Sequence, residues 1–323
     1  MKAIVFERYG SPDVLELREL ERPVPKPDQA LVRVRASSVN PIDWHRLRGQ
    51  PLFMRPSEGW RAPENRCLGA DLAGTVEQVG AGVTGLQPGD EVFGMSVRTL
   101  AEYAAVAADG LVAKPAGLTF EQAAAVPLAA LTALQALRRP GTLEPGRSVL
   151  VNGASGGVGT FAVQVAKAMG AEVTAVTSGR NVELVRSLGA DEVVDYTQED
   201  FTKRGARYDL VVDAVMNRSL GALRRVTEED GAIVLVGAAK GRTGGRPMLR
   251  LVRALIGRRF ASQHVLTFLA QRNRDDLLYL RGLLETGAIR PVIDRSYPLA
   301  DVPAAIRYLE TEHPRAKVVV TVP

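Results

Sequence analysis

The 323-residue chain is poor in metal-binding side chains, with one cysteine, Cys67, and three histidines, His45, His264 and His313. A single thiol cannot form an intramolecular disulfide, and it cannot supply the thiolates of a cysteine-rich structural zinc site. With so few imidazoles, a histidine-based catalytic zinc site is also hard to build. We therefore expect no bound metal, and a core formed by hydrophobic burial alone.

Long apolar runs are also missing. The most apolar stretch, residues 121–137, is interrupted by Glu121, Gln122 and Pro127. A membrane-spanning helix needs about 20 consecutive apolar residues, and the N-terminal MKAIVFERYG carries no apolar signal core. We therefore expect a cytoplasmic protein without a membrane partner.

The chain has no strong excess of charge of one sign, because it contains 41 basic and 36 acidic residues, for a net charge of +5. The one local basic cluster, residues 242–259, lacks interleaved aromatic side chains. A nucleic-acid surface gathers basic groups and often interleaves stacking aromatics. The sequence predicts no nucleic-acid partner and favours a solvated basic face or a phosphate-bearing cofactor.

Two different sequence patterns along the chain predict two domains. Residues 1–115 carry short β-branched runs separated by Pro and Gly turns, which is typical of a small barrel of antiparallel strands. A helical stretch follows over residues 119–139, with Thr119 as its N-cap and Gln122 three residues on. From residue 148, short apolar runs alternate with helical patterns, which predicts a doubly wound parallel sheet and an α/β fold. The last thirty residues return to strand, helix and strand.

The strongest motif is a glycine-rich turn between a predicted strand and a helix, with the sequence VLVNGASGGVGTFAVQVAKAMG. Glycine permits the tight turn, the close backbone approach of a pyrophosphate and the packing of helix on strand. The N–H groups at the start of the helix then face the phosphates. We therefore predict a dinucleotide site at Ser155, Gly156, Gly157 and Val158.

The same letters also satisfy Gly-x-Ser-x-Gly over residues 153–157, which is the nucleophile turn of α/β-hydrolases. In that alternative Ser155 is the nucleophile and His264 or His313 is its base. Neither histidine lies in a turn-rich loop after an acid-bearing strand. The motif therefore favours the dinucleotide interpretation.

The choice of cofactor is predicted from the end of the next strand, about 20 residues further on. Sites that prefer NAD usually place an acid there to bind the ribose 2′-hydroxyl. Here the strand is followed by Ser178, Gly179 and Arg180, without an acid. A hydroxyl and a guanidinium suit a 2′-phosphate, so we predict NADPH as the cofactor. A solvated arginine at the start of a helix is the alternative for Arg180.

These motifs together resemble the zinc-independent quinone oxidoreductase branch of the medium-chain dehydrogenases/reductases. The segments that carry the resemblance are SSVNPIDWHRLRG, LGADLAGTVEQVGAGVTGLQPGDEVFG, AEY, VPLAALTALQAL, NGASGGVG, SLGADEVVDY and RPVIDRSYPLADVPAAI. The resemblance implies a GroES-like β-barrel domain from residues 1–121 and 291–323. It implies a central Rossmann domain from residues 122–290.

The resemblance also addresses the metal. In the zinc alcohol dehydrogenases of this superfamily a cysteine stands in the place of Asn40, and a His-Glu pair stands in the places of Ala70 and Asp71. None of these ligands is present here, and the four-cysteine lobe is missing. The expectation is therefore a zinc-independent enzyme.

Three residues of the NPIDWH segment are candidate catalytic residues by resemblance. Asn40 resembles the asparagine that faces the nicotinamide and the substrate, with a capping or turn residue before Pro41 as the alternative. Asp43 resembles an aspartate close to the same site, and the alternative to a role as an acid is that it positions the ribose or the loop. His45 stands where quinone oxidoreductases often carry tyrosine, and it could donate to a substrate oxygen or lie idle on a loop.

Further cofactor contacts are implied by the same resemblance. Tyr196 matches a tyrosine near the adenosine phosphate. Gly237 and Ala238 end a strand whose backbone approaches the nicotinamide. A basic residue near the C-terminus, Arg315 or Lys317, reaches the cofactor in some members.

We therefore expect an NADPH-dependent reductase that transfers hydride to a small-molecule quinone or α,β-unsaturated carbonyl compound. Without a Lewis acid, oxidation of an alcohol lacks its main activator, whereas an activated acceptor needs only hydrogen-bond donors and a proton. The alternatives are an alkenal or enoyl reductase of a biosynthetic pathway, and a non-catalytic NADPH-binding protein that acts through partners. The resemblance also implies a homodimer, with strand pairing near residues 260–268.

Overall fold

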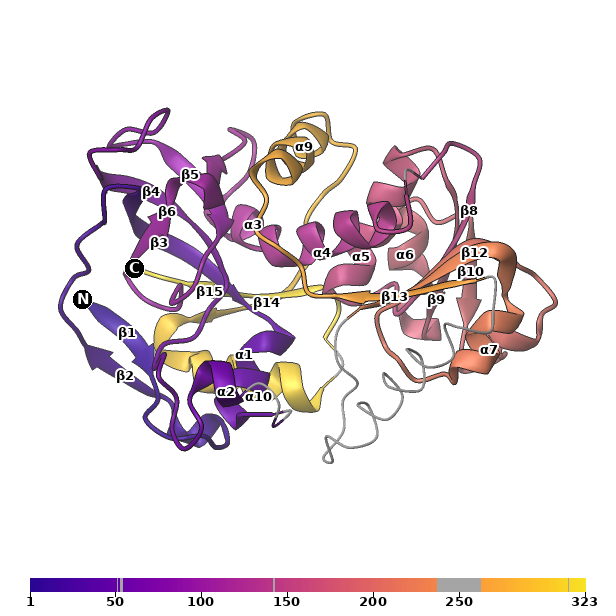
Figure 1. Cartoon of the computed structure of the whole chain (residues 1–323), viewed down its shortest axis with the longest axis horizontal. Helices are drawn as coiled ribbons and strands as arrows, with labels where there is room; N and C mark the ends of the chain where they lie inside the picture. Colours follow the sequence, from indigo (N-terminus) through magenta and orange to yellow (C-terminus); the bar gives the residue numbers. More distant parts are fainter. Residues whose placement is uncertain (51, 53–54, 142, 237–262, 313) are drawn as a thin grey trace. The chain divides into compact units, whose positions relative to one another are not determined.

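The computed structural model describes residues 1–323 apart from 51, 53–54, 142, 237–262 and 313 (Figure 1). The described chain divides into two compact units. Unit 1 contains residues 1–131, 272–285 and 291–323, and unit 2 contains residues 132–271 and 286–290. The predicted α/β class, with one antiparallel β domain and one parallel-sheet domain, is confirmed.

Unit 1 is built mainly from antiparallel strands. Its larger sheet has the order β14-β15-β3-β4-β5-β7, with β6 also paired to β3, and a separate hairpin joins β1 to β2. The strands are β1 (Lys2–Val5), β2 (Glu16–Glu19), β3 (Gln29–Val39), β4 (Asp71–Val79), β5 (Glu91–Met95), β6 (Tyr103–Ala107), β7 (Leu111–Ala113), β14 (Ile293–Pro298) and β15 (Lys317–Thr321).

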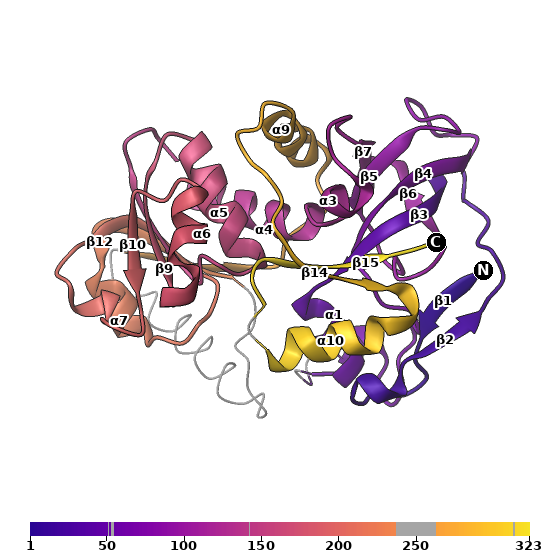
Figure 2. The same cartoon turned by 180° about the vertical axis from the view of Figure 1, so that it is seen from behind.

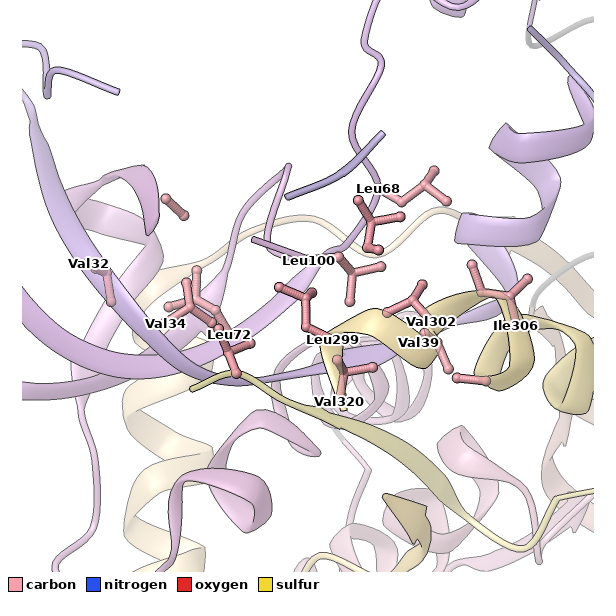
Figure 3. Close-up of a cluster of buried hydrophobic side chains, with 14 of the residues drawn as sticks. Val32, Val34, Val39, Leu68, Leu72, Leu100, Leu299, Val302, Ile306 and Val320 are labelled. Carbon is pink, nitrogen blue, oxygen red and sulfur yellow. The ribbon is translucent and has the colours of Figure 1, made fainter. Parts of the chain in front are cut away.

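The C-terminal segment completes this unit. Strand β15 pairs antiparallel with β3, so that Val318 lies opposite Val39. Helix α10 (Val302–Thr311) packs against α1 (Pro41–Arg48) and β15, as both views show (Figures 1 and 2). Apolar residues from the two chain ends form one buried core, in which Val39, Val302, Ile306 and Val320 lie together (Figure 3).

Unit 1 contains further helices besides α1 and α10. They are α2 (Arg55–Glu58), α3 (Phe120–Ala124) and α9 (Arg274–Glu285), with single-turn helices η1 (Pro12–Val14), η3 (Ala108–Gly110) and η6 (Leu299–Asp301). Arg274 donates to the backbone oxygens of Ala108 and Leu111, which ties the start of α9 to the region of β7.

The helical stretch expected over residues 119–139 is two helices rather than one. Thr119 and Gln122 form the expected reciprocal cap at the start of α3. A second helix, α4 (Pro127–Arg138), begins at Pro127. Proline lacks the N–H needed inside a helix but suits its first turn, so α3 ends just before it. The division into units falls within α4, and the N–H of Leu128 donates to Asp71 in unit 1.

Unit 2 contains a six-stranded, fully parallel sheet with the order β10-β9-β8-β11-β12-β13. Its strands are β8 (Ser148–Asn152), β9 (Glu172–Thr177), β10 (Glu192–Asp195), β11 (Tyr208–Asp213), β12 (Thr227–Val236) and β13 (His264–Phe268). Its helices are α5 (Gly157–Ala168), α6 (Val182–Ser187), α7 (Leu220–Arg225), η4 (Gly179–Asn181) and η5 (Phe201–Lys203). The central strands are buried along most of their length, as expected of a parallel sheet covered on both faces. The strand order reverses between β8 and β11, which is the switch point where such sheets bind ligands.

No helix within the described residues combines the length and apolar character that crossing a membrane requires.

The mixed core of unit 1 gives a first prediction. Ile306→Ala should lower the free energy of unfolding by about 3 kcal/mol, because it leaves a cavity in a fully buried cluster. Leu278→Ala, at a side chain that is 40% exposed, should change it by less than about 1 kcal/mol. Denaturant unfolding measures both values. Equal effects of the two substitutions would contradict the assignment of α10 to this core.

Candidate functional site

Unit 1 holds a buried polar cluster whose central member is Asp71. Its carboxylate is fully buried at the start of β4. Oδ2 accepts from the Ser38 hydroxyl at 2.5 Å and from the Asn40 side-chain amide at 2.9 Å. Oδ1 accepts from the backbone N–H of Leu128 at 2.7 Å. Because a buried carboxylate without partners is costly, this many donors account for its stability in the core.

Lys317, which opens the last strand, places its ammonium in the same cluster. Its Nζ lies 2.6 Å from Asn40 Oδ1 and 3.2 Å from Asp71 Oδ2, and the residue is 3% exposed. The pairing of Val318 with Val39 sets this register, because it brings Lys317 beside Asn40. The sequence suggests Lys317 as a cofactor contact, whereas the structure shows its ammonium bonded to Asn40 and Asp71 within unit 1.

The side-chain amide of Asn40 is fixed at both of its polar atoms. Nδ2 donates to Ser38 O at 3.2 Å and to Asp71 Oδ2, while Oδ1 accepts from Lys317. An amide nitrogen carries only two hydrogens. Asn40 therefore has no further side-chain N–H to donate to an acceptor oxygen in this arrangement.

Asp43 supports the loop that carries Asn40. Its carboxylate accepts from the backbone N–H of Asn40 at 2.8 Å, which caps the start of α1, and from the backbone N–H of Gly69 at 2.8 Å. Burial is the main cause that raises its pKa from 3.8 to about 6, and the nearby Asp71 raises it further, while the two backbone donors lower it. These contacts are those of a positioning residue that ties α1 to the chain before β4.

His45 faces its own helix end and the neighbouring ring. Its Nδ1 lies 3.0 Å from the backbone oxygen of Gln50, and its ring stacks on Trp44 at 3.7 Å between centroids. Since a carbonyl only accepts, Nδ1 carries the proton and the neutral ring presents Nε2 as an acceptor. Burial also lowers the pKa of His45. The expected donation to a substrate oxygen requires a protonated ring, which this environment disfavours.

In unit 2 the glycine-rich turn has the geometry that its sequence predicts. Gly153 adopts a φ of 88°, and its N–H and that of Ala154 donate to Val176 O on the adjacent strand. A Cβ on Gly159 would lie 2.1 Å from the oxygen of Gly153, so only glycine lets α5 approach the turn this closely. The first N–H groups of α5 have no acceptor within their own helix, and the turn can therefore cradle a pyrophosphate.

A small polar network joins this turn to the end of β9. The Ser155 hydroxyl oxygen accepts from Thr177 at 2.8 Å and from Asn181 Nδ2 at 3.0 Å. The same Nδ2 lies 3.2 Å from the Ser178 hydroxyl. Asn181 Oδ1 is buried and has no hydrogen-bond partner among the residues the structure describes. An unpaired buried acceptor oxygen at this position fits a donor such as a ribose hydroxyl. The hydrogen-bond partners of the Ser155 hydroxyl are Thr177 and Asn181, whereas the hydrolase alternative requires a histidine there.

The parallel sheet brings most of the predicted cofactor residues to one edge. Ser155, Gly156, Gly157 and Val158 follow β8, Ser178 and Arg180 follow β9, and Tyr196 follows β10. These three strands are adjacent, and their carboxyl ends meet at the same edge. The Tyr196 side chain is 48% exposed there. Gly237 and Ala238 lie outside the described residues.

Asn152 and Asp213, which sequence reasoning missed, lie at the switch point itself. Asn152 Nδ2 donates to Asp213 Oδ1 at 2.8 Å, and the N–H groups of Val215 and Met216 donate to the same oxygen. Burial raises the pKa of Asp213, and its Oδ2 has no partner in the described part of the chain. The sequence does contain a pattern that could have identified these two residues, because each is the first polar residue after an apolar run of a strand.

The features of the two units indicate a nucleotide-dependent enzyme. The doubly wound sheet and its glycine turn are those of a nucleotide-dependent enzyme, to which unit 1 adds the buried Asn40 cluster. No group of three His, Cys, Asp or Glu side chains suited to a metal ion occurs among the described residues.

Comparison with known proteins identifies the family within that class. Residues 26–131 match the alcohol dehydrogenase GroES-like domain, and residues 188–320 match a domain described as zinc-binding dehydrogenase. The chain is 35% identical over 335 residues to the 2-methylene-furan-3-one reductase of Solanum lycopersicum, covering 99% of this chain and 79% of that protein. It shares the same identity and coverage with a chloroplastic NADPH-dependent alkenal/one oxidoreductase of Arabidopsis thaliana. A solved quinone oxidoreductase from Coxiella burnetii superimposes with a TM-score of 0.85 at 32% identity, covering 100% of this chain and 99% of that one.

The chain belongs to the quinone oxidoreductase-like branch of the medium-chain dehydrogenase/reductase superfamily. It is an oxidoreductase, as the sequence predicts.

The raised pKa of Asp43 predicts a pH dependence of stability. A folded pKa near 6 exceeds the unfolded value of 3.8, so its stabilising contribution is complete below pH 3.8 and is lost as the pH rises through 6. The free energy of unfolding of the wild type relative to Asp43→Asn should therefore fall by about 2–3 kcal/mol between about pH 4 and pH 7. Denaturant melts at several pH values measure this difference. A difference that stays flat or rises with pH would contradict the assignment.

The glycine turn gives a third prediction. Gly159→Ala should lower the free energy of unfolding by about 2–3 kcal/mol through overpacking, even though alanine favours a helix by about 1 kcal/mol. Gly156→Ala is the matched control, because its Cβ would lie 3.4 Å from Gly153 O, a tolerable contact. We expect it to change stability by less than about 1 kcal/mol. Equal losses in the two variants would show that close packing at residue 159 is unimportant.

Proposed function

We propose that this oxidoreductase is zinc-independent, uses NADPH and transfers a hydride to quinones or α,β-unsaturated carbonyl compounds. The observation that carries this proposal is the buried contact of the Lys317 ammonium with Asn40 and Asp71. The names of the relatives support the substrate class, since one is an alkenal/one oxidoreductase and another is a quinone oxidoreductase.

The ammonium supports zinc independence by electrostatics. The family resemblance assigns two positions around the catalytic zinc to Asn40 and Asp71. In this chain a lysine Nζ lies 2.6 Å and 3.2 Å from those side chains. A divalent cation at the same place would be repelled by the ammonium at short range in a buried environment. The Lys317 ammonium therefore supplies positive charge beside the two positions that would otherwise bind a metal ion.

The edge of the parallel sheet fits a dinucleotide. The glycine turn and the start of α5 suit the pyrophosphate, and the buried Asn181 Oδ1 offers an acceptor beside Ser155. Ser178 and Arg180 follow β9, where the ribose 2′ substituent is read. NADPH bound at this edge supplies the hydride.

The residues of unit 1 prepare the acceptor. Lys317 on Oδ1 and Asp71 on Nδ2 hold the Asn40 amide in one orientation, so that it presents a fixed dipole. Asp43 fixes the backbone of Asn40. His45 is neutral near pH 7 and accepts at Nε2, so we do not assign it as the proton donor.

The test is a turnover assay with purified protein, NADPH and a panel of quinones, α,β-unsaturated ketones and aldehydes, with and without a chelator. We expect reduction of a quinone or an enone at a rate that the chelator leaves unchanged. Asn40→Ala should lower kcat at least about tenfold through loss of orientation, while the Kd for NADPH changes less than about twofold. Asn65→Ala, at a loop asparagine bonded to Arg98, is the matched control and should keep full activity.

Each other outcome has a definite meaning. NADPH binding without turnover of any acceptor would favour the non-catalytic alternative. Turnover restricted to enoyl or alkenal substrates would favour the biosynthetic reductase. Loss of activity with the chelator would contradict zinc independence, and full activity of Asn40→Ala would remove Asn40 from the mechanism.

We also propose a homodimer located in the cytoplasm. Strand β13 stands at the end of the parallel sheet in the described residues, and an edge strand is a common place for pairing with a second copy. Sedimentation as a single copy at micromolar concentration would contradict the dimer. The cytoplasmic location stays a prediction from the sequence.

A further inference from the structure

Asp195 is an acid at the cofactor edge of the parallel sheet to which the proposed function gives no role. It is the last residue of β10 and pairs in register with Thr177, the last residue of β9. Its Oδ1 accepts from the backbone N–H of Thr197 at 2.9 Å and from the Thr197 hydroxyl at 2.7 Å. These hydrogen bonds, and one from the N–H of Gly179, keep the pKa of Asp195 below its ordinary value, so the side chain is a carboxylate.

The carboxylate lies directly against the turn that follows β9. A Cβ built on Gly179 would be 2.6 Å from Asp195 Oδ2, and the N–H of Gly179 is hydrogen-bonded to this side chain. Gly179 stands between Ser178 and Arg180, the residues proposed to read the ribose 2′ substituent. The negative charge is therefore next to the place where a 2′-phosphate would bind.

In the sequence, no acid directly follows β9. On that ground alone, the site is expected to bind NADPH in preference to NADH. The fold changes this expectation, because the neighbouring strand β10 brings the Asp195 carboxylate to the same turn in space. Arg180 favours a 2′-phosphate by its positive charge, whereas Asp195 opposes one by its negative charge. The preference for NADPH is therefore the balance of two opposite charges.

We propose that Asp195 is a specificity-determining residue for the nicotinamide cofactor, limiting the preference for NADPH over NADH. The inference rests on the proposed function, since it assumes that a dinucleotide binds at this edge. The carboxylate raises the free energy of the bound 2′-phosphate by like-charge repulsion and leaves a 2′-hydroxyl unaffected. The chain therefore uses NADH measurably beside NADPH.

Asp195→Asn tests the role of the charge. The amide keeps an oxygen that can accept from Thr197, but it carries no negative charge. By titration calorimetry, the Kd for NADPH should fall about three- to tenfold, while the Kd for NADH should change less than about twofold. The gain for NADPH should shrink as the salt concentration rises, because exposed charges are screened.

Asp200→Asn is a matched control in the same unit. Asp200 Oδ1 accepts from the N–H and the hydroxyl of Thr202, at 3.0 Å and 2.9 Å, which repeats the Asp-x-Thr turn of Asp195. Asp200 caps the start of η5 through its hydrogen bond from the Thr202 N–H. We expect this variant to leave the ratio of the two dissociation constants unchanged.

Three results would overturn the inference. If Asp195→Asn leaves both dissociation constants, for NADPH and for NADH, unchanged, the charge of Asp195 has no effect on cofactor choice. If the variant weakens the binding of both cofactors equally, Asp195 only holds the turn. Wild-type protein that binds neither cofactor would instead contradict the proposed function itself, and the inference with it. If Asp195→Asn does not fold, Asp195→Ser gives the same measurement, because its hydroxyl can also accept from Thr197.

Discussion

The buried contact between Lys317 and the Asn40–Asp71 pair is the interaction on which unit 1 and its candidate site depend. It joins three segments that are far apart in the sequence, namely the end of β3 and the starts of β4 and β15. Burying an ammonium and a carboxylate is costly unless both are paired and hydrogen-bonded. Here both are, so the arrangement forms only when the C-terminal strand has paired with β3. The cluster of Asn40, Asp71 and Lys317 is therefore complete only when the larger sheet of unit 1 is complete.

The candidate cofactor edge depends on a different constraint, the lack of space. The backbone of α5 approaches the turn after β8 so closely that Gly159 has no room for a side chain. The polar groups around the turn then find partners across strands, as Ser155 does with Thr177 and Asn181. Asn152 and Asp213 similarly bridge β8 and β11 at the switch point. The edge is thus held in place where a pyrophosphate needs close approach to the backbone.

Much of this organisation could be predicted from the sequence, because local signals were strong. The glycine turn, the cap formed by Thr119 and Gln122 and the run of parallel strands all depend on contiguous residues. What could not be predicted depends on pairing between distant segments. The hydrogen-bond partners of Lys317 follow from the register of β15 on β3. The contact of Asp195 with the turn after β9 follows from the register of β10 on β9.

A double-mutant cycle on Asn40 and Lys317 tests most directly whether the two side chains act as one unit. The quantity is kcat/KM for NADPH-dependent reduction of one quinone or enone by Asn40→Ala, Lys317→Met and the double variant. If the ammonium acts by holding Asn40, the double variant should be no more than about threefold worse than the poorer single variant. Losses that simply multiply would show that the two residues act independently, and would contradict the account.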